Sequence, residues 1–149
     1  MFSLIITIIS IALVAALAVA TIYYGGSAFT QGTAKANASA FVAAGQQVNG
    51  ALALSANDNG GARAADTAAL VTSKYLAAAP SVAGSSFTVN ATDVSAPVSS
   101  AAVCVSIAQS AGSTITADTP LAAPDTSKPY TCSGTTTGAV FSGTFSFRG

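Results

Sequence analysis

Two cysteines, Cys104 and Cys132, carry the clearest chemistry in this chain of 149 residues. Cysteines that lie in a polar region behind an apolar segment indicate an exported domain in an oxidising compartment, where the two thiols pair as a disulfide. The alternative is two unrelated buried cysteines in a cytosolic domain. The sequence does not predict a zinc site, because two Cys and no His cannot supply four ligands.

Catalytic chemistry has few candidates in this sequence. The chain has no His and no Glu, and its five acidic residues are all Asp. An activated nucleophile needs an adjacent base and a group that stabilises developing charge. No phosphate-binding glycine motif is present. We therefore expect no enzyme activity, no small-molecule substrate and no cofactor.

Two other polar patterns are candidates for sites. Asp58 lies in the segment SANDNGG, residues 55–61, whose oxygens suit calcium, but the Asn-Gly pair favours an ordinary turn. The N-glycosylation pattern occurs at residues 37–39 and at residues 90–92. We consider Asn90 the better acceptor, because the first pattern falls on a helix that we expect to pack.

The first 24 residues, MFSLIITIISIALVAALAVATIYY, contain no charged side chain. At about 1.5 Å per residue, a helix of this length crosses a bilayer core of about 30 Å. A cleaved signal peptide fits less well, because its apolar stretch is about 7–15 residues long and follows a basic leader. Two interpretations stay open: an ordinary membrane anchor, and a helix that leaves the bilayer to form the core of a polymer.

The overall charge does not point to a partner. Charged residues make up 7% of the chain, and five basic residues balance five acidic ones. Because no basic or acidic region stands out, the composition provides no evidence for nucleic acid or anionic lipid as a partner, and nucleic-acid binding stays open.

We divide the chain into four parts: 1–26 as an apolar membrane or filament-core helix segment, 27–54 as its amphipathic continuation, 55–85 as a connecting loop with a short helix, and 86–149 as a β-rich head with a disulfide. Apolar positions recur every four residues from Ala36 to Leu52, which predicts the amphipathic helix. At Gly25-Gly26 we expect a helix break, either a kink or melted turn, or the end of one helix before another starts near Ser27.

Alternating patterns predict strands at residues 86–90 and 139–147. In the second strand one face carries three aromatic side chains that we expect to cover the second half of the long helix: Phe141, Phe145 and Phe147.

The segment 99–112 fits either a strand or a helix, and its bracketing Ser and Gly residues favour a helix. Residues 113–128 are predicted as a loop, and 130–132 as a short strand.

The order of these elements, together with ALALSANDNGGARAADTAALVTSKYLAAAP at residues 51–80, resembles type IV pilins and pilin-like proteins. The resemblance implies an α+β fold with a long N-terminal α-helix packed on a small antiparallel β-sheet. It also implies a structural subunit of an extracellular filament that serves adhesion, motility, or DNA or protein transfer. The alternative is a monomeric, membrane-anchored, exported binding domain.

In that family a leader is removed and the apolar helix begins the mature chain, so the resemblance implies Met1 as the processed N-terminus. The subunit would lie in the inner membrane before an assembly machinery adds it to a helical homopolymer. The residues implied to pack in the filament core are Phe2, Leu4, Ile5, Ile8, Ile9, Leu13, Ala16 and Leu17.

One position departs from the family pattern. Most pilins have a Glu at the fifth mature position, thought to pair with the amino terminus of a neighbouring subunit, and here that position is Ile5. The resemblance therefore implies a divergent major pilin, a minor pilin or an archaeal-type filament protein. We expect the hydroxyls of Ser3, Thr7 and Ser10 to bond back to their own helix instead of replacing the carboxylate.

Overall fold

The computed structural model describes residues 2–115, 123–138 and 140–148, and this part of the chain is α+β. The predictions for Met1 and for residues 116–122 of the loop fall outside the described residues. The chain divides into two units, Met1–Thr33 and Ala34–Gly149. The elements in chain order are α1 (Phe2–Asp58), α2 (Thr67–Thr72), β1 (Ser81–Val82), β2 (Ser85–Ser86), β3 (Thr88–Val89), β4 (Asp93–Val98), α3 (Ala101–Ser110), β5 (Tyr130–Thr137) and β6 (Val140–Arg148).

The described residues of the first unit form the first part of α1, and they correct one prediction. The backbone is helical through Gly25 and Gly26, so the predicted melted turn and the predicted second helix start are both wrong. A glycine weakens a helix by up to about 1 kcal/mol relative to alanine, but it keeps its backbone N–H and C=O for the helical hydrogen bonds. The Thr30 hydroxyl also donates to the Gly26 carbonyl at 3.2 Å.

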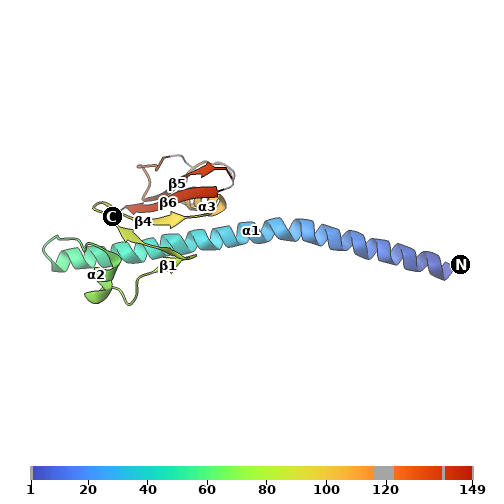
Figure 1. Ribbon diagram of the computed structural model, residues 1–149, viewed down its shortest axis with the longest axis horizontal. Helices are drawn as coiled ribbons and strands as arrows, with labels where there is room; N and C mark the ends of the chain where they lie inside the picture. Colours follow the sequence, from blue (N-terminus) through green and yellow to red (C-terminus); the bar gives the residue numbers. More distant parts are fainter. Residues whose placement is uncertain (1, 116–122, 139, 149) are drawn as a thin grey trace. The chain divides into compact units, whose positions relative to one another are not determined.

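The second unit holds a four-stranded antiparallel sheet in the order β3-β4-β6-β5, and β1 and β2 form a separate two-stranded hairpin. Figure 1 shows β4, β6 and β5 alongside the C-terminal part of α1. The strand β4 was not predicted. Its Pro97 pairs with Thr144 of β6 but lies beyond the two residues that pair with β3. Proline is tolerated there because no second neighbour needs its missing N–H.

Three aromatic rings join helix and sheet in the core. Phe41 of α1 lies 6.0 Å from Phe87 and 5.9 Å from Phe145 between ring centroids, and Phe87 lies 6.1 Å from Phe145. Around them the buried face of α1 is built mainly from small residues, recurring at intervals of three and four: Ala34, Ala38, Phe41, Ala44, Val48, Ala51 and Leu52. The prediction that the aromatic face of β6 covers the second half of the long helix is confirmed.

The shorter helices differ in how well they match their predictions. The short helix predicted within residues 55–85 is present as α2, and Asp66 caps its start by accepting a hydrogen bond from the Ala69 N–H at 2.6 Å. The ambiguous segment forms the helix α3, with Ser100 at its N-cap. The helix α1 ends at Asp58, four residues beyond the predicted position, and the Gly61 N–H closes its last turn by donating to the Ala56 carbonyl.

Candidate assembly surface

The dominant surface feature of the first unit is the apolar segment, defined here as residues 2–24 of α1. Its large apolar side chains are between 53% exposed, at Ile5, and 85% exposed, at Phe2. By length and composition the helix is able to cross a membrane. Exposed apolar surface of this extent is costly in water, at about 25 cal/mol per Å². The apolar segment is therefore a surface that needs a covering, either lipid or protein.

The residues predicted for the filament core are spread around this helix. Intervals of three and four place one stripe on a single face: Phe2, Ile5, Ile9, Leu13 and Ala16. Leu4 and Ile8, four residues apart, lie on another side of the helix. Leu17 lies beside the stripe, just beyond its edge at Leu13. A helix that is apolar all round is buried in a large core or in a membrane, rather than lying half in water.

Three hydroxyls of the apolar segment are bonded within their own helix. The hydroxyl of Thr7 donates to the Leu4 carbonyl at 2.8 Å, and that of Ser10 donates to the Ile6 carbonyl at 2.8 Å. Thr21 does the same with the Ala18 carbonyl at 2.9 Å. The predicted back-bonding of Thr7 and Ser10 is confirmed. These hydroxyls leave no donor that a covering partner would have to satisfy.

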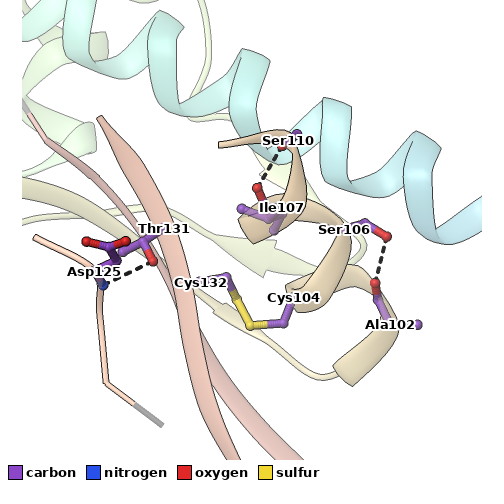
Figure 2. Close-up of a disulfide and its surroundings, with 8 residues drawn as sticks. All are labelled: Ala102, Cys104, Ser106, Ile107, Ser110, Asp125, Thr131 and Cys132. Atoms are coloured by element: carbon purple, nitrogen blue, oxygen red, sulfur yellow. Dashed lines mark hydrogen bonds between the residues drawn. A yellow bond between two sulfur atoms is a disulfide. The ribbon is translucent and has the colours of Figure 1, made fainter. Parts of the chain in front are cut away.

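In the second unit, the predicted disulfide between Cys104 and Cys132 is present, with a Cα–Cα distance of 5.2 Å. Figure 2 shows the bond joining α3 to β5, and both cysteines are fully buried. On the far side of β5, the Thr131 hydroxyl accepts a hydrogen bond from the Asp125 N–H at 3.4 Å. The disulfide thus connects the helix to an edge strand of the sheet and closes the loop between them.

The two N-glycosylation patterns have different settings. Residues 90–92 are exposed in the turn between β3 and β4, where the Asn90 side-chain amide donates to the Ser95 hydroxyl at 3.0 Å. In the pattern at 37–39 the central Ala38 is buried in the core and the Ser39 hydroxyl is bonded to the Lys35 carbonyl. Glycosylation of Asn90 stays a prediction.

The carboxylates of Asp58 and Asp125 each accept hydrogen bonds from nearby residues. Asp58 accepts a hydrogen bond from the Tyr75 hydroxyl at 2.8 Å, and this bond, followed by burial and the carboxylate charge, raises the pKa of Tyr75. Hydrogen bonds from the Ser127 hydroxyl and N–H lower the pKa of Asp125. No cluster of three or more His, Cys, Asp or Glu side chains suited to a metal occurs in the described ranges.

A second surface feature was not predicted: a furrow of about 580 Å³ between α1 and α3, with Tyr130 of β5 at its side. We call it the α1–α3 furrow. It combines residues 35–46 with residues 106–110, and it lies wholly within the second unit. Pattern analysis of either helix alone does not reveal it, because the furrow exists only once the disulfide-linked α3 is in place.

Comparison with known proteins found no matching family model, no matching curated protein and no matching solved structure. The candidate surface is therefore assessed from its own geometry.

Proposed function

We propose that this chain is the structural subunit of an extracellular, type IV pilus-like filament, which it builds by packing its apolar segment against the apolar segments of other copies. The observation that carries the proposal is a helix whose first 23 described residues are apolar on every side and exposed, while its continuation is amphipathic and packs on a small sheet. A bilayer covers the apolar segment before assembly, and other subunits cover it afterwards.

The chemistry of the apolar segment favours association between helices. It contains many small residues, including Ala15, Ala16, Ala18 and Ala20, which let helix backbones approach closely. It contains no charged side chain that would have to be desolvated or paired. Dispersion contacts and burial therefore drive the packing.

The position of Ile5 gives the proposed filament a specific property. Where most pilins have Glu, this side chain is apolar and 53% exposed in the single chain. Removing a buried carboxylate takes away a large desolvation penalty along with its ion pair. The proposed assembly is therefore held in register by the shape of the apolar surface rather than by an ion pair.

The test is the substitution Ala16→Lys, compared with wild type in the cells that make this protein. A charge at the centre of an apolar helix costs about 2.5–3.5 kcal/mol in membrane insertion scales, and every subunit of a polymer bears that cost. We expect wild-type fibres in sheared surface material viewed by negative-stain microscopy and no fibres from the variant. Normal fibres from Ala16→Lys would refute packing through the apolar segment.

The matched control is Ala53→Lys, which makes the same change at an exposed alanine of the same helix beyond the apolar segment. We expect this variant to make fibres. Both variants are checked for intact subunit in the membrane fraction, so that loss of fibres is separated from loss of protein. If wild-type cells carry the subunit in the membrane and shed no fibres, the monomeric anchored domain replaces the filament subunit as the function.

A further inference from the structure

The dipeptide Asn-Gly occurs twice in the chain, in two different structural settings. Asn49-Gly50 lies inside α1, and Asn59-Gly60 lies in the turn that follows the last helical residue, Asp58. The backbone nitrogen after an asparagine is placed to close a five-membered ring on the side-chain carbon Cγ. Glycine leaves this nitrogen unshielded because it has no Cβ, and its backbone changes conformation easily. Both dipeptides are therefore intrinsically reactive, and the fold decides which of them reacts.

In the turn after α1, the nitrogen that would attack is accessible. Asn59 and Gly60 are both exposed, and the Gly60 N–H has no hydrogen bond to any of the described residues. A Cβ added at Gly60 or at Gly61 would meet no atom within 4 Å. The φ angles of these two glycines are 65° and 95°, typical of the residues that end a helix. The Gly60 nitrogen is thus open to solvent, in a turn with free space around both glycines.

The hydrogen bonds that restrain Asn59 are local. Its N–H and its side-chain amide both donate to the Ser55 carbonyl, at 3.1 and 2.7 Å, and its own carbonyl accepts from the Ala62 N–H at 3.3 Å. The side-chain bond has to open before Cγ reaches the Gly60 nitrogen. Helix ends and turns open at a small fraction of the free energy of global unfolding. These bonds therefore slow the ring closure without preventing it.

The dipeptide inside α1 is held in a different way. The Gly50 N–H lies in the interior of the helix, where it donates to the carbonyl four residues earlier. Val48 and Leu52 on either side are 0% and 1% exposed and belong to the core. Ring closure at Asn49 requires non-helical backbone, so this part of α1 would have to leave the sheet. Such an opening approaches the free energy of global unfolding, and the fold protects Asn49.

From this contrast we propose that Asn59 is a site of spontaneous deamidation, with the Gly60 nitrogen as the nucleophile. That nitrogen gives up its proton to solvent and forms a bond to Cγ of Asn59. The bond from Cγ to Nδ2 breaks, and Nδ2 takes up a proton and leaves as ammonia. Water then opens the resulting succinimide at one of its two carbonyls, which gives aspartate or isoaspartate at position 59. The sum is one water consumed and one ammonia released, without oxidant or reductant.

The modification changes the charge of the chain and the end of α1. Five basic and five acidic residues balance in the unmodified chain, so one new carboxylate gives it a net negative charge. The carboxylate follows Asp58 directly, and it is unable to donate to the Ser55 carbonyl as the amide does. Modified and unmodified subunits are therefore separable by charge. The proposal applies to a single subunit and does not depend on assembly.

The test compares three asparagines of the same full chain. The chain in detergent is kept in mildly alkaline buffer, because the attacking nitrogen reacts after losing its proton. Samples are digested at intervals and analysed by mass spectrometry for aspartate and isoaspartate. Asn90 is the matched control for exposure, because it lies in a turn but is followed by Ala91. We expect conversion at Asn59, with isoaspartate among the products, to be at least about tenfold faster than at Asn49 or Asn90.

Unfolding in urea separates the effect of the fold from that of the dipeptide. In urea Asn49 should react nearly as fast as Asn59, because both are followed by glycine. Equal rates at these two residues in the folded chain would overturn the proposal. So would a rate at Asn59 no higher than at Asn90, or a product without isoaspartate.

The variant Asn59→Gln provides a second measurement. It keeps an amide at this exposed position but needs a larger, slower-forming ring. On isoelectric focusing, aged wild type should acquire a more acidic band, and the aged variant should lack it. An acidic band of equal intensity in the variant would place the modification elsewhere and contradict the proposal.

Discussion

The two parts of α1 belong to one continuous helix but differ in whether their large apolar side chains are buried or exposed. In Phe2–Thr33 the large aliphatic and aromatic side chains are exposed, whereas from Ala34 to Asp58 the buried face consists largely of alanines. The more apolar part is therefore the less buried one. What decides burial within the chain is the pattern: a single stripe has a sheet to pack on, and an all-round apolar surface needs neighbours on every side.

This difference assigns separate roles to the two parts. Contacts of the second part stabilise the subunit, so substitutions there change its unfolding free energy. The apolar segment makes no such core contacts in the described part of the subunit. Under the proposed function, substitutions there should change assembly and leave the detergent-solubilised subunit as stable as before.

The strongest test of this difference makes the same change, Phe to Ala, in each part of the helix. Phe41 is 2% exposed among the rings of Phe87 and Phe145, and Phe29 is 74% exposed. We expect Phe41→Ala to lower the unfolding free energy by about 3–5 kcal/mol, because it removes buried surface and leaves a cavity. Phe29→Ala is expected to stay within about 0.5 kcal/mol of wild type. Urea titration of the solubilised subunit measures both, and similar losses would show that the two parts do not differ as described.

Removal of the disulfide is expected to have the next largest effect. Cys104→Ala combined with Cys132→Ala reopens a loop that the bond closes over a sequence separation of 28 residues. The chain-entropy model gives a loss of about 3–4 kcal/mol for a loop of this length. Wild type in reducing buffer should unfold at the same urea concentration as the double variant. An unchanged midpoint would show that α3 and β5 hold together without the bond.

Two glycines of α1 test how closely the sheet approaches the helix. A Cβ at Gly45 would lie 2.9 Å from the Phe145 ring, while at Gly50 it would meet no atom within 4 Å. Gly50→Ala should stabilise the subunit by up to about 1 kcal/mol through helix propensity. Gly45→Ala gains the same propensity but overpacks the core, so we expect a net loss of about 1 kcal/mol. Two shifts of the same sign in urea titration would contradict the close approach.

The parts of the fold that follow from local periodicity were predictable. The alternation through Phe141 and Phe145 identified β6 and its buried face, and the Cys104–Cys132 pair was expected from its exported context. The strand β4 was missed because Pro97 argues against a strand until its neighbours are known. The melted turn and the second helix start predicted at Gly25-Gly26 were wrong because a weak propensity penalty does not by itself end a helix.

Of the two surface features, only one could be predicted from the sequence. The apolar segment is visible in the sequence, because a long uncharged run needs no tertiary information to be recognised. The α1–α3 furrow is not, since its walls come from residues 35–46 and 106–110 and its character depends on hydrogen bonds that form within each helix. The exposed apolar surface is thus recognisable from the sequence, whereas the α1–α3 furrow is seen only in the folded second unit.

The smallest expected effect concerns the end of α1, where Tyr75 donates its hydrogen bond to Asp58 at 2.8 Å. This bond raises the pKa of Tyr75 above its usual value of 10.0. A raised pKa in the folded state means that the stabilisation is fully present below about pH 10 and is lost as the pH rises through the folded pKa. Wild type should therefore lose stability in alkaline urea titrations, while Tyr75→Phe should be slightly less stable at neutral pH and should lack that part of the alkaline loss. Because the bond joins residues of the second unit, filament yield should be the same for both proteins at neutral pH. If Tyr75→Phe unfolds normally but fails to assemble, the end of α1 also takes part in contacts between copies.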